Sequence, residues 1–136
     1  MTAEHGGFAT AINCIDGRVQ EPVAAWVKAH LNVRYVDTVT EPGADKALSE
    51  GPAEVAESIR RKVGISVSAH HSGAVAVVGH HDCAANPAPK EEHLRQIQAA
   101  VAVIAAWGLP VRVIGLWVDE RWQVEAVCDS EGRGPA

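Results

Sequence analysis

The sequence lacks any long apolar segment, and none of its hydrophobic runs approaches the ~18 residues that cross a bilayer as a helix. Its first residues also lack the basic and then apolar pattern of a secretory signal. Internal repeats, low-complexity tracts and linkers are absent as well. With 47% hydrophobic and 21% charged residues, the 136-residue chain has a globular composition. We therefore expect one cytoplasmic domain over residues 1–136, with no membrane partner.

Positive charge and cysteine are also scarce. Lysine and arginine total 12 against 17 acidic residues, a net charge of -5, so nucleic acid is not expected as a partner. The three cysteines, Cys14, Cys83 and Cys128, are too few and too far apart for a disulfide framework. In a reducing cytoplasm such residues serve as metal ligands, nucleophiles or core residues. A glycine-rich nucleotide fingerprint is absent too, so no nucleotide cofactor is indicated.

Strand-like and helix-like segments alternate along the chain. Apolar runs and helical spacing predict strands at 8–16, 33–39, 73–80, 111–119 and 121–129, and helices at 20–31, 52–66 and 89–108. Residues 41–51 are predicted to be a loop. This alternation is typical of an α/β protein with three layers and a mostly parallel central sheet. We expect the strand order 2-1-3-4, with the fifth strand as an antiparallel edge.

Two polar stretches follow strands that should be neighbours. In the expected order the strands at 8–16 and 73–80 lie side by side, and their outgoing loops diverge. Ligands bind at such a switch point in open α/β sheets. The first strand leads into the stretch CIDGR and the other into HHDC, so both stretches should lie in one crevice.

The sulfur and imidazole groups of these stretches predict a metal site. His80 and Cys83, three residues apart in a turn, can bind one ion together, and Cys14 supplies a third ligand. Two thiolates and one imidazole suit Zn²⁺, and three protein ligands leave a fourth position open, as in catalytic sites. Two alternatives stay open: the three residues are half-buried polar side chains without a metal, or His81 replaces His80. The H-x-x-C spacing favours His80.

Asp16 and Arg18 are candidate catalytic residues. If the backbone after the first strand is extended, then Cys14, Asp16 and Arg18 point to the same side. Arg18 can keep Asp16 ionised and fix its direction through paired hydrogen bonds. Asp16 can then take a proton from zinc-bound water, orient the hydroxide, or enter as a fourth ligand and close the site. The alternative is an ordinary salt bridge that caps a loop.

The combination C-x-D-x-R after the first strand and G-H-x-x-C after a later one resembles the β-class carbonic anhydrases. The resemblance runs from about residue 9 to residue 118. It implies a zinc enzyme in which zinc-bound hydroxide reversibly hydrates CO2 to bicarbonate. It also implies zinc ligands at Cys14, His80 and Cys83, the catalytic pair Asp16 and Arg18 beside the metal, and a homodimer or higher homo-oligomer.

The sequence departs from this family in two places. The family's R-N-A-G stretch at the end of the second strand is replaced by TVTEPGA at residues 38–44. The glycine that usually follows the last ligand is Ala84. A relative that hydrolyses carbonyl sulfide or carbon disulfide fits the same ligands.

Two other functions use the same cysteines. A cysteine-dependent phosphatase needs the spacing C-x5-R to close its phosphate cradle, but only three residues separate Cys14 from Arg18, so we reject it. A non-enzymatic zinc or redox sensor is the second alternative, in which Cys14 and Cys83 form a disulfide when the metal is lost.

Overall fold

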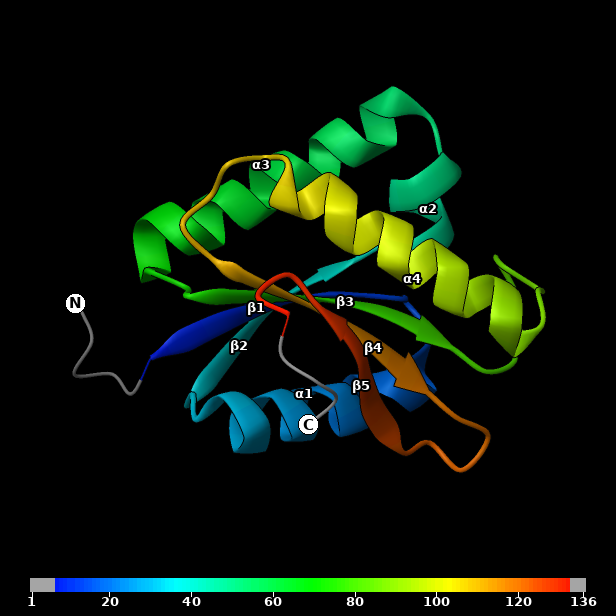
Figure 1. Ribbon diagram of the computed structural model, residues 1–136. Helices are drawn as coiled ribbons and strands as arrows, with labels where there is room; N and C mark the ends of the chain where they lie inside the picture. Colours follow the sequence, from blue (N-terminus) through cyan, green and yellow to red (C-terminus); the bar gives the residue numbers. More distant parts are fainter. Residues whose placement is uncertain (1–6, 133–136) are drawn as a thin grey trace.

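The computed structural model describes residues 7–132, with a five-stranded sheet at its centre (Figure 1). The strands are β1 (Phe8–Asn13), β2 (Tyr35–Thr40), β3 (Ala74–His80), β4 (Arg112–Val118) and β5 (Val124–Asp129). The helices are α1 (Gln20–Leu31), α2 (Ala44–Glu50), α3 (Ala53–His70) and α4 (Lys90–Ala105), with a short 3-10 helix, η2 (Gly17–Val19). Within residues 7–132, no helix combines the length and apolar character needed to span a membrane.

The strand order is β2-β1-β3-β4-β5, which confirms the order predicted from the sequence. The first four strands are parallel, and β5 is antiparallel to β4, its neighbour in the closing hairpin. β1 and β3 are adjacent, with Ile12 paired to Val77. The segments that leave the carboxyl ends of β1 and β3 therefore start next to each other.

The helices form a layer on each face of the sheet, α1 on one side and α2, α3 and α4 on the other (Figure 1). Successive strand residues face opposite layers. Ala11 packs in the same cluster as Val23 of α1, whereas the next residue, Ile12, packs in the cluster that contains Ile59 of α3 and Ile104 of α4. The apolar character of β1, β3 and β4 follows from this burial on both faces.

The expectation of a loop over residues 41–51 is wrong, because residues 44–50 form α2. Gly43 precedes the helix with φ 61°, in the left-handed region that glycine adopts without strain. Ala44, Asp45 and Leu48 are buried, and the helix contacts α4. A two-turn helix between glycines, with an acidic residue turned inward, lacks the apolar spacing that identifies longer helices.

α3 is longer than predicted and ends at His70 instead of residue 66. Val67 continues the apolar stripe one turn beyond Val63, and both belong to the core on this face of the sheet. His71 then stops the helix with φ 58°, a left-handed C-cap conformation.

Substitution of Gly115 by alanine should destabilise the fold. A Cβ at this position in β4 would collide with Ile97 Cγ2 and lie 2.6 Å from Cys128 Sγ. Overpacking of this kind costs about 1–3 kcal/mol. Gly64→Ala in α3 is the matched control: nothing lies within 4 Å of its added methyl group, so it should stabilise by about 0.5–1 kcal/mol. Urea unfolding measures both, and equal stabilities would contradict the packing described for β4.

Candidate metal centre

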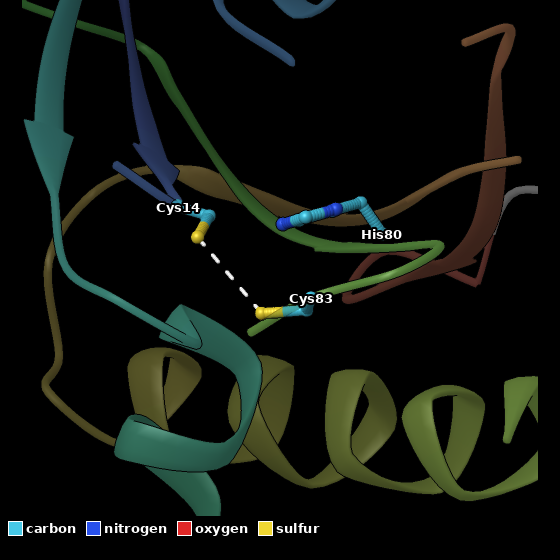
Figure 2. Close-up of side chains that lie close together, drawn as sticks. All are labelled: Cys14, His80 and Cys83. Atoms are coloured by element: carbon cyan, nitrogen blue, oxygen red, sulfur yellow. Dashed lines mark hydrogen bonds between the residues drawn. The ribbon is translucent and has the colours of Figure 1, made fainter. Parts of the chain in front are cut away.

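Cys14, His80 and Cys83 converge at the carboxyl ends of β1 and β3 (Figure 2). Cys14 directly follows β1, His80 is the last residue of β3, and Cys83 lies in the loop that leaves β3. The Sγ atoms of the two cysteines are 4.0 Å apart, and the ligand atoms of all three residues lie within 4.8 Å of one another. The structure thus brings together the three residues singled out from the sequence.

The His80 ring is oriented so that Nε2 is left free. Its Nδ1–H donates to the backbone carbonyl of His81 at 2.8 Å. Nε2 is buried and has no hydrogen-bond partner among the described residues. A buried nitrogen without a hydrogen bond costs free energy. A histidine that binds a metal through one nitrogen usually donates the N–H of the other to a carbonyl or carboxylate, as Nδ1 does here. A metal ion beside the two sulfurs would satisfy this atom. The His81 side chain is exposed and lies outside the ligand group.

The two cysteines differ in proton affinity. The hydrogen bond with the Cys83 sulfur lowers the pKa of Cys14, and His80 and the backbone N–H groups of Gly43 and Asp16 act in the same direction against the effect of burial. The same bond to Cys14, together with burial, raises the pKa of Cys83. The pKa values of the two neighbouring thiols are therefore moved in opposite directions. Binding of a cation to both sulfurs as thiolates would be linked to proton release.

Asp16 and Arg18 pair as expected, but through a turn. The backbone after Cys14 is not extended: Asp16 precedes the 3-10 helix η2, and its carboxylate accepts from the Arg18 N–H at 2.9 Å. Arg18 Nε donates to Oδ1 at 3.1 Å and Nη2 donates to Oδ2 at 2.7 Å. These bonds lower the pKa of Asp16 to about 2. Asp16 lies outside the group of ligand atoms formed by the cysteines and His80.

Arg18 also contacts two residues that the sequence analysis did not single out. Its Nη1 donates to Asp82 Oδ2 at 3.2 Å and its Nη2 to the Asp82 carbonyl at 3.1 Å. Its guanidinium carbon lies 4.5 Å from the centre of the Trp122 ring. The position of Asp82 in the sequence, between the candidate ligands His80 and Cys83, could have identified it as a site residue. Nothing in the sequence identifies Trp122. Arg18 thus joins the loops after β1, β3 and β4.

A pocket of about 360 Å³ opens beside Cys83. Its other lining residues are His81, Asp82, Pro87, Ala88, Pro89, Lys90 and Trp117. A larger pocket of about 500 Å³ lies elsewhere, between β2 and α3, and includes none of the three candidate ligands. Of these two pockets, the smaller one is lined by a candidate ligand, Cys83.

A comparison with protein families identifies one match. A family model described as "Putative carbonic anhydrase" matches residues 4–128. The sequence matches no curated protein closely enough to count it as a relative.

The similar solved structures are β-carbonic anhydrases. Tetrameric enzymes of the ascomycete Sordaria macrospora match at 15% identity and TM-score 0.56, over 93% of this chain and 83% of that chain. Isoform I of the protozoan Trichomonas vaginalis matches at 12% identity and TM-score 0.58, over 89% and 82%. CafA of Aspergillus fumigatus matches at 15% identity and TM-score 0.51, over 90% and 76%. At these identities the likeness shows the fold.

Replacement of either cysteine of the centre by serine should abolish stoichiometric metal binding. Cys14→Ser and Cys83→Ser each replace a thiolate with a hydroxyl, a far weaker ligand for zinc. Cys128→Ser is the matched control, because this thiol lies on β5 outside the ligand group. Metal content after purification and dialysis measures all three. Stoichiometric zinc in Cys14→Ser or Cys83→Ser would show that the ligand set is wrong.

Removal of Arg18 should raise the pKa of Asp16. The pKa of about 2 depends first on the Arg18 hydrogen bond, so Arg18→Ala should bring it towards the ordinary value of ~3.9. Because the pKa is lower in the folded state, this pair stabilises the fold fully above about pH 4 and ceases to do so as pH falls to 2. NMR titration of the Asp16 carboxyl carbon measures the shift, with Arg121→Ala as control. A wild-type pKa near 4 would contradict the pairing.

Proposed function

Because the chain belongs to the carbonic anhydrase family whose model spans residues 4–128, we propose that it is a zinc-dependent lyase that reversibly hydrates CO2 to bicarbonate. One observation carries the proposal. The ligand atoms of Cys14, His80 and Cys83 converge within 4.8 Å, and the buried Nε2 of His80 has no partner among residues 7–132. Two sulfurs and one imidazole nitrogen are a donor set that fits Zn²⁺.

In this proposal the three residues would hold the metal through two sulfurs and one imidazole nitrogen. Zinc, when bound, lowers the pKa of a coordinated water to about 7 and so provides a nucleophile for CO2 at neutral pH. Burial of Cys14, His80 and Cys83 excludes water from the ligand side of the centre. The pocket beside Cys83 is the route by which a small substrate reaches it.

Asp16 acts as a hydrogen-bond acceptor that orients the reacting water. The Arg18 hydrogen bonds hold the pKa of this carboxylate at about 2, so it stays ionised and retains no proton at neutral pH. A carboxylate with such a low pKa is a weak base, so it accepts protons poorly. It can still accept a hydrogen bond in a fixed direction. Of the roles that the sequence left open for Asp16, orientation therefore fits best. Arg18 is the residue that fixes its direction.

We also propose a homo-oligomer in a reducing, cytoplasmic environment. Ile15, which lies between Cys14 and Asp16, has a side chain 63% exposed, and Ile65 on α3 is exposed to the same extent. Tyr35 on the edge strand β2 is 40% exposed. The Sordaria macrospora neighbours are tetrameric, which supports this proposal, and a second subunit would bury some of these exposed groups. The cytoplasm would keep Cys14 and Cys83 reduced, as metal binding requires.

The test combines zinc content with stopped-flow CO2 hydration on the same sample. We expect one zinc per chain with turnover, and in Asp16→Ala zinc with turnover reduced by about 100-fold or more, the order of magnitude that misplacement of a reacting group costs. Glu57→Ala, which removes an exposed carboxylate on α3, should retain both zinc and turnover. Unchanged turnover in Asp16→Ala would remove Asp16 from the mechanism.

Other outcomes on the wild-type protein would replace the proposal. Zinc without CO2 hydration would favour carbonyl sulfide or carbon disulfide as substrate, and the same sample can be assayed for their hydrolysis. Absence of zinc with a Cys14–Cys83 disulfide would favour the sensor. The sulfurs are 4.0 Å apart, so a bond of ~2.05 Å would require them to approach by roughly 2 Å.

A further inference from the structure

A buried polar cluster lies next to the metal centre, between α2, α4 and the loop that carries Cys83. Its members come from three segments and are 1–4% exposed: Asp45 on α2, Asn86 in the loop, and His93 and Gln96 on α4. None of them is a site residue predicted from the sequence, and Asp45 falls within the loop predicted at residues 41–51. Buried polar groups are retained only where their hydrogen bonds are satisfied.

Both ring nitrogens of His93 form hydrogen bonds. Nδ1 lies 2.6 Å from Asp45 Oδ2, and Nε2 lies 3.0 Å from the backbone carbonyl of Asn86. A carbonyl only accepts hydrogen bonds, so Nε2 is the donor to Asn86. The His93 and Asp45 side chains are each only 1% exposed. Two buried partners thus hold the ring in one orientation.

Through Asn86 the pair fixes the loop of Cys83. Asn86 Nδ2 donates to Asp45 Oδ1 at 3.1 Å and to Gln96 Oε1 at 2.7 Å. The Asn86 backbone N–H lies 3.3 Å from the Cys83 carbonyl, and the N–H groups of Ala85 and Asn86 also face the Cys83 sulfur. The position of this ligand therefore depends on where Asn86 is held.

The start of α2 also contacts the segments of the other two ligands. A Cβ on Gly79, the residue before His80, would collide with Asp45 Oδ2, so the carboxylate lies against the β3 backbone there. The segment before α2 is also bonded to the segment of Cys14, because the Glu41 N–H donates to the Asn13 carbonyl at 2.9 Å. A Cβ on Gly43 would lie 3.3 Å from the Cβ of Asn86, and φ at this residue is +61°, so glycine suits this close approach to the loop.

We propose that Asp45, His93 and Asn86 are positioning residues for the metal centre, which hold the start of α2 against all three ligand segments. The inference rests on the proposed function only in assuming that the centre binds zinc. It gives a role to the TVTEPGA stretch that departs from the family pattern: Glu41 in this stretch bonds to the backbone before Cys14, and the stretch leads directly into Asp45. Residues that orient ligands in this way change metal affinity by 10–100-fold when replaced.

The test measures zinc affinity by competition with a chromophoric chelator, in the full-length chain. His93→Gln and Asn86→Ala should each weaken zinc binding by 10–100-fold. Ser66→Ala is the matched control, because Ser66 is also buried and bonded to Thr10 and Ser72, towards the amino end of β3. Its zinc affinity should stay within about threefold of wild type. Equal affinities in Ser66→Ala and the two cluster variants would overturn the proposal.

A second readout separates positioning from loss of fold and needs no metal. Amide hydrogen exchange over residues 83–89 in the metal-free protein should be faster in His93→Gln and Asn86→Ala than in Ser66→Ala, whereas exchange in β1 should be alike in all three. Unchanged exchange over 83–89 would refute the positioning role. Neither readout involves CO2, so a chain that binds zinc but fails to hydrate CO2 would defeat the proposed function and leave this inference standing.

Discussion

The parallel pairing of β1 with β3 is the constraint on which the metal centre depends. Ile12 lies opposite Val77, so Cys14, two residues further on, emerges beside the Gly79–His80 end of β3. A shift of one residue in this register would turn alternate side chains to the other face of the sheet. The apolar burial of both strands against helices on two faces excludes such a shift. Packing of the core thus determines where sulfur and imidazole meet.

Two buried thiols and an imidazole nitrogen without a hydrogen bond make an arrangement that a cation would complete. The pKa of Cys14 is lowered and that of Cys83 is raised, and His80 Nε2 lies beside the sulfurs without a hydrogen bond among the residues described. Binding of a divalent metal would satisfy all three atoms and would stabilise the folded chain at the same time. Around them, Arg18 on one side and the Asp45–His93 pair on the other restrain the loops that carry the ligands.

The strand order and the convergence of Cys14, His80 and Cys83 could be predicted from the sequence, because both depend on strong local patterns. Apolar runs locate β1, β3 and β4, and the polar residues at their ends follow from the strand order. Features set by tertiary contacts were missed. α2 has too few apolar positions to stand out, and Asp45 is buried only because His93 and Asn86, distant in sequence, bond to it. The turn at η2 and the stacking of Trp122 on Arg18 also depend on segments that meet only in the fold.

X-ray absorption at the zinc K-edge of the purified protein tests the central claim most directly, because it reports the ligands of the bound metal. The account predicts two sulfur ligands at ~2.3 Å and nitrogen or oxygen ligands at about 2.0–2.1 Å, with the imidazole signature of a single histidine. A zinc bound by four sulfurs, or by nitrogen and oxygen alone, would contradict the assignment of Cys14, His80 and Cys83 as the metal centre.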